Sequence, residues 1–240
     1  MRDIANLSIV MMGASGGIGS ACALQIARPG VKIALCSIDG PGLEKLAAQT
    51  RGKGADIFSS VVDVCSEKQI EDFINASTEK FGAADVLINF AGLSVTAAAG
   101  EFTEADYDRV MDVNVKGMFF GIKHFIKHVN DEKGALIINF GSMASKRANA
   151  AAPHYSAAKA AVNMFSQGLS EQLKKRNIRI TVINPGPVNT SFYEGRIPPE
   201  KRTKFMEASD VAEVVEFVLS RDSRLVFHDL MFDSLEYFKG

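Results

Sequence analysis

Short apolar runs rich in β-branched residues alternate with longer helical stretches along almost the whole chain. Seven such runs cover residues 7–12, 31–37, 57–62, 86–90, 136–140, 178–183 and 225–231. Helical patterns occupy residues 20–27, 43–49, 67–81, 104–128, 154–175 and 210–220. The last of these has Asp210 as its predicted N-cap, with Glu213 three residues further on. Repeated βα units predict an α/β fold, a doubly wound and mostly parallel seven-stranded sheet with helices on both faces.

Length, charge and cysteine usage narrow the class further. The 240 residues fit one domain, so residues 1–240 are predicted to form a single unit. The net charge of −1 gives no reason to expect nucleic acid or an anionic membrane as a partner. Three distant cysteines (Cys22, Cys36 and Cys65) favour reduced thiols in a cytoplasmic protein over disulfides or a zinc site. The histidines are scattered, so no metal site is predicted, and the run at residues 7–12 is too short for a membrane helix.

A glycine-rich turn follows the first apolar run. Gly13, Gly17 and Gly19 have the spacing GxxxGxG, and a helical stretch follows at once. In a βαβ unit such a turn lets backbone N–H groups approach a pyrophosphate, which a Cβ would block. The turn predicts a Rossmann-type dinucleotide site at the carboxyl ends of the strands; the alternative is simply a tight strand-to-helix connection.

A tyrosine and a lysine lie four residues apart in the predicted helix at residues 154–175. Tyr155 and Lys159 therefore share one helix face. The ammonium is expected to favour the phenolate and to lower the tyrosine pKa from its usual value of about 10. The pair is a candidate proton donor and acceptor for a carbonyl or an alcohol, and the alternative is a chance pair on a solvated helix.

Together these features give the chain a resemblance to the short-chain dehydrogenase/reductase family, in its compact single-domain branch. The resemblance extends over roughly residues 5 to 235. The ordered motifs that carry it are Gly13-xxx-Gly17-Ile18-Gly19, Asp63-Val64, Asn89-Phe90-Ala91-Gly92, Asn114, Ser142, Tyr155-xxx-Lys159 and Pro185-Gly186-Pro187-Val188-Asn189-Thr190. The resemblance implies an NAD(P)-dependent oxidoreductase that transfers a hydride between a nicotinamide cofactor and a secondary alcohol or ketone.

Four residues match the family's catalytic positions. Tyr155 is implied to be the general acid or base on the substrate oxygen, and Ser142 to hydrogen-bond that oxygen. Lys159 is implied to lower the tyrosine pKa and to hold the nicotinamide ribose. Asn114 is implied to hold a water that relays protons to Lys159, and its alternative is a helix-interior asparagine bonded to backbone.

A larger set matches the family's cofactor contacts. Val188 and Thr190 match the positions that hold the nicotinamide carboxamide. Asp63 matches the one that meets the adenine amine, although it can also simply cap a strand end. The whole implied set is Gly13, Ser15, Gly17, Ile18, Gly19, Ser37, Ile38, Asp63, Val64, Asn89, Ala91, Gly92, Tyr155, Lys159, Pro185, Gly186, Val188 and Thr190.

Two family positions are altered to apolar residues. Met12 replaces a threonine before the first glycine, and Phe90 replaces the second asparagine of Asn-Asn-Ala-Gly. Both positions lie at the ends of neighbouring central strands. We hypothesise that a packing contact between these two side chains replaces the family's hydrogen-bonded tie.

The end of the second predicted strand bears on the choice between NAD and NADP. It consists of Ser37, Ile38 and Asp39, and Gly16 provides no cation in the glycine turn. A 2′-phosphate beside Asp39 would lack a matching cation, so the sequence favours NAD over NADP.

Residues 190–208 resemble the family's mobile lid, and we name them the lid segment. Phe192 and Tyr193, with Met143, are candidates for an apolar substrate pocket, and His154 is expected at its rim. A basic cluster in the same segment can attract an acidic substrate or be solvated; it comprises Arg196, Lys201, Arg202 and Lys204.

Other functions and assemblies remain open to the sequence. A catalytically silent NAD(P)-binding sensor or scaffold keeps the fold without turnover. Sugar epimerisation or dehydration uses a similar Tyr-Lys pair in longer relatives. By resemblance, the helices at residues 104–128 and 154–175 pair between subunits in a homodimer or homotetramer.

Overall fold

The strands form one parallel sheet. The computed structural model of the chain describes residues 3–239. In chain order the strands are β1 Ser8–Met12, β2 Lys32–Ser37, β3 Asp56–Val61, β4 Val86–Asn89, β5 Ala135–Phe140, β6 Ile178–Pro185 and β7 Asp229–Phe232. Their order in the sheet is β3-β2-β1-β4-β5-β6-β7, and every neighbouring pair is parallel. The predicted doubly wound α/β fold is confirmed.

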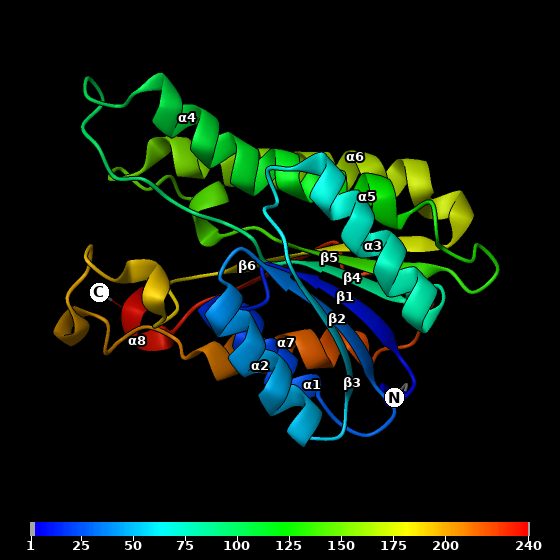
Figure 1. Cartoon of the computed structure of the whole chain (residues 1–240). Coiled ribbons are helices and arrows are strands. Elements are labelled where there is room, and N and C mark those ends of the chain that lie inside the picture. The colour runs from blue at the N-terminus through cyan, green and yellow to red at the C-terminus, as the bar shows by residue number, and fades with distance from the viewer. Residues whose placement is uncertain (1–2, 240) are drawn as a thin grey trace.

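Helices cover both faces of this sheet (Figure 1). The longer ones are α1 Gly17–Ile26, α2 Gly40–Gly52, α3 Glu67–Phe81, α4 Glu104–Met111, α5 Gly117–Phe125, α6 Pro153–Leu173 and α7 Ala208–Leu219, and the short α8 Leu235–Phe238 ends the described chain. Helices α1, α2 and α7 lie on one face, and α3, α5 and α6 lie on the other (Figure 1). No helix among residues 3–239 is long and apolar enough to cross a membrane.

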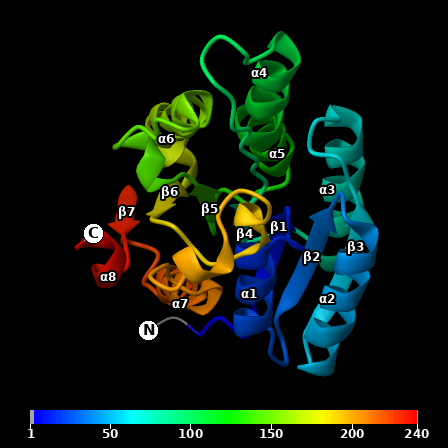
Figure 2. The ribbon, with the colours of Figure 1, turned by 90° about the vertical axis from the view of Figure 1, so that its left-hand side faces the viewer.

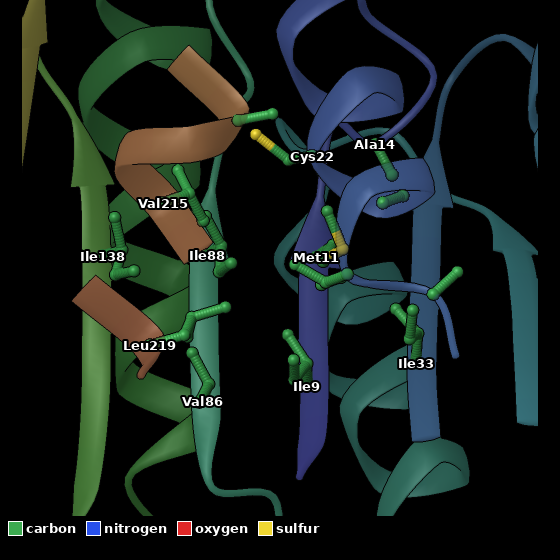
Figure 3. Close-up of a cluster of buried hydrophobic side chains, with 14 of the residues drawn as sticks. Ile9, Met11, Ala14, Cys22, Ile33, Val86, Ile88, Ile138, Val215 and Leu219 are labelled. Atoms are coloured by element: carbon green, nitrogen blue, oxygen red, sulfur yellow. The ribbon is translucent and has the colours of Figure 1, made fainter. Parts of the chain in front are cut away.

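Period-two alternation along the strands divides the core into two clusters. In β1, Ile9 and Met11 join the cluster under α1 and α7, whereas Val10 and Met12 join the cluster under α3 and α5. Figure 3 shows the first cluster, where Val215 of α7 packs towards the central strands. Each fully buried aliphatic side chain of this kind contributes roughly 1.5–3 kcal/mol.

The strand order reverses beside β1. The chain passes from β1 to β2 and β3 in one direction, and then crosses back to β4 on the other side of β1. Ligands of doubly wound sheets bind at such a switch point, beyond the carboxyl ends of the strands. The glycine turn follows β1 there, and the lid segment lies on the same side of the molecule, which faces the viewer in Figure 2.

Several predicted bounds are wrong. Helix α1 begins at Gly17 rather than at residue 20, and α2 spans Gly40–Gly52 rather than residues 43–49. The helix expected at residues 104–128 is interrupted by one π-helical turn, Asp112–Lys116, between α4 and α5. Strand β7 begins at Asp229 rather than at residue 225. Helix α7 begins two residues early, so Asp210 is not the N-cap: its carboxylate accepts the backbone N–H of Glu207 at 2.8 Å from within the first turn.

The hypothesis of a Met12–Phe90 packing contact is also wrong. Met12 packs in the cluster under α5, while Phe90 packs against the opposite cluster and lies 4.6 Å from Phe140, ring centroid to ring centroid. The two side chains therefore lie on opposite faces of the sheet. The tie that remains is backbone, because the N–H of Phe90 donates to the carbonyl of Met12 at 2.9 Å.

Candidate active site

Two adjoining cavities lie at the carboxyl ends of the strands. The smaller, of about 290 Å³, is lined by the glycine turn, the end of β6 and the pair Tyr155 and Lys159. The larger, of about 770 Å³, lies between the loop after β5, the lid segment and α8. Ser142 and Tyr155 line both cavities, together with Gly186, Phe192 and Tyr193. A molecule in the smaller cavity and a molecule in the larger cavity can therefore come into contact beside the side chain of Tyr155.

The glycine turn is closely confined on two sides. Gly13 has a φ of 76°, and a Cβ there would lie 2.6 Å from the backbone nitrogen of Ala91. A Cβ on Gly17 would lie 2.5 Å from the Cγ2 of Thr190. Helix α1 begins at Gly17 with no side-chain cap, and the smaller cavity has one charged residue in its wall, Lys159. An uncapped helix N-terminus without a neighbouring carboxylate fits a phosphate.

Tyr155 lies in the first turn of α6, where Pro153 begins the helix. Burial raises the pKa of Tyr155 above its usual value, and the charge of Tyr193 adds to the effect. A hydrogen bond with Ser142 and the positive charge of Arg196 act in the other direction and lower the pKa. The net shift is opposite to the predicted one, because burial outweighs the neighbouring charges. The side chain is a protonated phenol at neutral pH.

Lys159 is almost fully buried one turn further along α6. Its Nζ donates to the carbonyl of Phe140 at 2.8 Å and lies 5.7 Å from the ring centroid of Tyr155. Burial lowers the pKa of Lys159 to about 8. The ammonium is hydrogen-bonded to the Phe140 carbonyl at the end of β5, and the pKa of Tyr155 is raised by burial rather than lowered as the sequence predicts.

Asn114 occupies the π-helical turn between α4 and α5. Its Nδ2 donates to the carbonyls of Leu93 and Val110, both at 2.8 Å, so part of its role is the helix-interior one. Its Oδ1 is buried and has no hydrogen-bond partner within residues 3–239. A Cβ built on Gly92 would lie 3.0 Å from this Oδ1 and 3.3 Å from the Nζ of Lys159. Because Gly92 has no side chain, a space is left between the unpaired Oδ1 of Asn114 and the ammonium of Lys159. A water in this space can hydrogen-bond to both groups.

Ser142 caps the short helical turn after β5. Its hydroxyl accepts the N–H of Ala144 at 3.1 Å, and its backbone N–H donates to the Oδ1 of Asn184 at 2.7 Å. Asn184 is fully buried in β6 and is itself bonded to Asn163 of α6. Ser142 is thus held between two strand ends and one helix, with its hydroxyl beside Tyr155.

Most of the remaining implied residues separate into two groups. The smaller cavity brings together Gly13, Gly17, Ile18, Gly19, Gly92, Tyr155, Lys159, Pro185, Gly186, Val188 and Thr190. Neither cavity is lined by Ser15, Ser37, Ile38, Asp63, Val64, Asn89, Ala91 or Asn114.

Asn89 is turned away from the cavities. Its Nδ2 donates to the Oδ1 of Asn139 at 2.7 Å across β4 and β5, on the face of the sheet under α5 and α6. Asn89 is therefore a tie between central strands. Its own Oδ1 is buried without a partner among the described residues, close to Met12.

The end of β2 has no cation. The hydroxyls of Ser15 and Ser37 lie 2.6 Å apart, and Ile38 is 71% exposed. The carboxylate of Asp39 accepts the N–H of Gly42 at 3.2 Å and so caps α2. Asp63 stabilises the loop after β3, because its carboxylate accepts the N–H of Cys65 at 2.9 Å.

His154 is not a rim residue. It is buried, lines neither cavity, and stacks on Phe102 with ring centroids 3.5 Å apart. Its Nε2 donates to the carbonyl of Val95 at 2.6 Å. His154 therefore holds the loop after β4 against α6. No group of three or more His, Cys, Asp or Glu side chains in residues 3–239 is placed to hold a metal ion.

Sequence reasoning missed part of the larger cavity. Its wall includes Arg147, from the loop after β5, and Asp233 and Tyr237, from the C-terminal end. Aromatic contacts link this end to the active site: they run from Tyr237 to Phe205, Tyr193, Phe192 and Tyr155 with ring centroids 5.2–5.8 Å apart. No local sequence signal marks these residues, because the fold alone brings them together.

Comparison with known proteins agrees with this geometry. A family model described as short chain dehydrogenase matches residues 8–200. An uncharacterised oxidoreductase of Staphylococcus saprophyticus is 32% identical over 226 residues, which are 94% of this chain and 96% of the relative. Levodione reductase of Leifsonia aquatica is 30% identical over 237 residues, 91% of this chain and 89% of the relative.

Solved structures are similar over almost the whole chain. An alcohol dehydrogenase from Thermococcus sibiricus, complexed with 5-hydroxy-NADP, has a TM-score of 0.88 at 27% identity, covering 96% of this chain and 97% of the other. An NAD⁺-bound xylitol dehydrogenase has a TM-score of 0.88 at 26% identity, covering 97% of this chain and all of the other.

Proposed function

The chain belongs to the short-chain dehydrogenase family of oxidoreductases, and we propose that it transfers a hydride between a nicotinamide cofactor and a secondary alcohol or ketone. One observation carries the proposal: Tyr155 and Ser142 line both the glycine-turn cavity and the larger cavity. A carbonyl in the larger cavity can therefore meet a proton donor where the two cavities join.

Four side chains take part in proton transfer to the substrate oxygen. Tyr155, a neutral phenol whose pKa burial raises further, gives a proton to the substrate oxygen in reduction. Ser142 donates a hydrogen bond to the same oxygen, on which negative charge grows. Lys159 and the unpaired Oδ1 of Asn114 hold a water across Gly92 that returns a proton to the phenol.

The smaller cavity fits the phosphate and nicotinamide parts of a dinucleotide. Gly13 and Gly17 leave space that a Cβ would fill, and the wall contains no carboxylate. Val188 and Thr190 would hold the carboxamide, and Lys159 the ribose hydroxyls. When bound, the cofactor supplies or accepts the hydride.

The end of β2 favours NAD over NADP. Ile38 is exposed where a cation would have to meet a 2′-phosphate, and the acidic Asp39 follows it. We expect NADH to bind at least about tenfold more tightly than NADPH, measured side by side by titration calorimetry. Ile38→Arg should narrow this ratio, since it supplies a cation. Tighter binding of NADPH by the wild type would contradict the preference.

Turnover distinguishes this function from its alternatives. A silent sensor binds NADH without oxidising it in the presence of any ketone, and an epimerase or dehydratase changes its substrate without net use of NADH. The test is the absorbance of reduced nicotinamide with a panel of ketones and, in the reverse direction, of secondary alcohols. We expect consumption of NADH that is stoichiometric with alcohol formed; binding without turnover across the panel would support the sensor.

Location and assembly are also proposed. We propose a cytoplasmic protein, supported by three free cysteines, of which Cys22 and Cys36 are buried.

We propose a homodimer or homotetramer formed through α5 and α6, supported by Phe119 and Met164, which are 40% and 66% exposed on these helices. The lid segment is proposed to close over bound ligand.

A further inference from the structure

The larger cavity is rich in positive charge. Its wall contains three charged residues, Arg147, Arg196 and Asp233. The carboxylate of Asp233 is already engaged, because it accepts the N–H of Ser234 at 2.8 Å and packs against Gly186. Neither arginine has a carboxylate within ion-pair distance among residues 3–239. Two guanidinium groups and one carboxylate therefore line the cavity, which leaves an excess of positive charge in its wall.

Arg196 is positioned by aromatic rings rather than by an acid. Its Cζ lies 4.4 Å from the ring centroid of Phe192 and 5.6 Å from that of Tyr193. Its Nη1 makes one long contact, 3.4 Å, with the carbonyl of Ser94. A guanidinium has five N–H donors in a planar fork, so most of the donors of Arg196 have no partner in the described chain.

This charge lies close to the reacting position. The Phe192 ring that carries the guanidinium is itself 5.8 Å from the ring of Tyr155, centroid to centroid. The charge of Arg196 is also felt at the phenol, since it lowers the pKa of Tyr155 against the effect of burial. A negative group held by Arg196 would therefore lie in the same cavity as a carbonyl held by Tyr155 and Ser142, with the Phe192 ring between the two positions.

We propose that the substrate carries a carboxylate, which Arg196 binds with the help of Arg147. A guanidinium matches a carboxylate with two parallel hydrogen bonds, and both arginines, although exposed to solvent, line the cavity. The apolar wall formed by Met143, Phe192 and Phe205 accommodates a carbon body between the two ends. The substrate is then a keto acid, or the matching hydroxy acid, with an apolar or aromatic body.

This inference rests on the proposed function. Comparing each acid with its methyl ester distinguishes a failure of the carboxylate site from a failure of the oxidoreductase function. The substrates are aromatic keto acids with increasing distance between carbonyl and carboxylate, from benzoylformate to para-acetylbenzoate, each beside its methyl ester. The variants are Arg196→Gln, Arg196→Lys and Arg147→Gln. Lys204→Gln is the control, because it removes a lid-segment charge that does not line the cavity.

For at least one acid of the series we expect wild-type kcat/KM to exceed that of its ester by tenfold or more. Arg196→Gln should lower kcat/KM for that acid at least tenfold, mainly through KM, and should lower kcat/KM for the ester by a factor at least fivefold smaller, since the ester loses only the effect of the charge on the pKa of Tyr155. Arg196→Lys should recover part of the loss, Arg147→Gln should have a smaller effect of the same sign, and Lys204→Gln should have none.

Equal losses for acid and ester in Arg196→Gln would overturn the proposal, and would mean that the arginine only fastens the lid segment. Turnover of esters and neutral ketones without any preference for acids would also overturn it, while leaving the oxidoreductase function intact. If no ketone is reduced, the proposed function fails. Calorimetric titration of the same acids into wild type and Arg196→Gln, both with NADH, then decides the carboxylate site, and equal affinities would overturn it.

Discussion

At the scale of single residues, burial decides the chemistry of the active site. Burial raises the pKa of Tyr155 above its usual value because its surroundings oppose the phenolate, and burial lowers the pKa of Lys159 to about 8 because its surroundings oppose the ammonium. The sequence placed both residues on one helix face but predicted the sign of the tyrosine shift wrongly. Spacing along a helix shows which side chains are neighbours; it does not show how deeply they are buried.

Lys159 should make stability depend on pH in the alkaline range. Its pKa is about 8 in the folded chain against 10.5 for an ordinary lysine, so the unfolded chain binds more protons between these values and stability rises with pH there. Lys159→Met removes this dependence. The free energy of unfolding of the variant, minus that of the wild type, should fall by on the order of 3 kcal/mol between pH 8 and 10.5. Parallel urea titrations measure it, and a difference that is constant with pH would contradict the burial of a titrating lysine.

Two glycines should respond oppositely to alanine. Gly13→Ala should destabilise the chain by at least about 1–2 kcal/mol, because its φ is 76° and the new Cβ would meet the backbone of Ala91. Gly168 lies inside α6 with no atom of its own chain near its Cβ position, so Gly168→Ala should stabilise the unpaired subunit by about 1 kcal/mol. Thermal unfolding of both variants provides the check. A neutral Gly13→Ala would mean that the turn is not confined.

At the scale of elements, the sequence predicts the positions of the strands well, but it does not predict where a helix is interrupted. Apolar runs predicted the strands β1, β2, β4, β5 and β6 well, because these central strands are buried on both faces, whereas the partly exposed edge strand β7 begins four residues later than predicted. The π-helical turn at Asp112–Lys116 was not predicted, because no residue pattern in the sequence distinguishes one π-helical turn within a longer helix. That turn nevertheless places Asn114, whose unpaired oxygen only the packed structure reveals.

The contact between α5 and β1 should be intolerant of added volume. A Cβ on Gly121 would lie 2.5 Å from the Sδ of Met12 and 3.0 Å from the Oδ1 of Asn89. Gly121→Ala should therefore destabilise by about 1–3 kcal/mol. Adding Met12→Thr should recover part of this loss, because threonine is smaller and brings a hydroxyl to the unpaired oxygen of Asn89. Urea unfolding of the two single variants and the double variant tests the coupling, and simple additivity would contradict it.

At the scale of the whole molecule, the substrate cavity depends on the C-terminal end. Helix α8 lies beside the lid segment (Figure 1), and Tyr237 contacts Phe205 with ring centroids 5.4 Å apart. The sequence predicted the cofactor half of the site, because its motifs are local to strand ends. Of the substrate half it predicted Met143, Phe192 and Tyr193, which line the larger cavity, but not Arg147, Asp233 or Tyr237. These residues come from distant segments that only the fold brings together.

Tyr237→Ala should separate substrate binding from cofactor binding. The side chain lines the larger cavity and not the smaller one. We expect the KM for the ketone to rise about tenfold, because the lost aromatic contact contributes about 1.4 kcal/mol to substrate binding. The Kd for NADH should not change. Phe238→Ala, at an exposed position that lines neither cavity, is the control. Equal weakening of NADH binding would mean that α8 supports the whole site.

The most direct test of the account compares wild type with Tyr155→Phe in two measurements on the same samples, the Kd for NADH and the rate of ketone reduction. The phenol is proposed to supply a proton where the two cavities meet, so the variant should bind NADH within about twofold of wild type and reduce ketones at least about 100-fold more slowly. Wild-type turnover by the variant would contradict the assignment of Tyr155 as the proton donor.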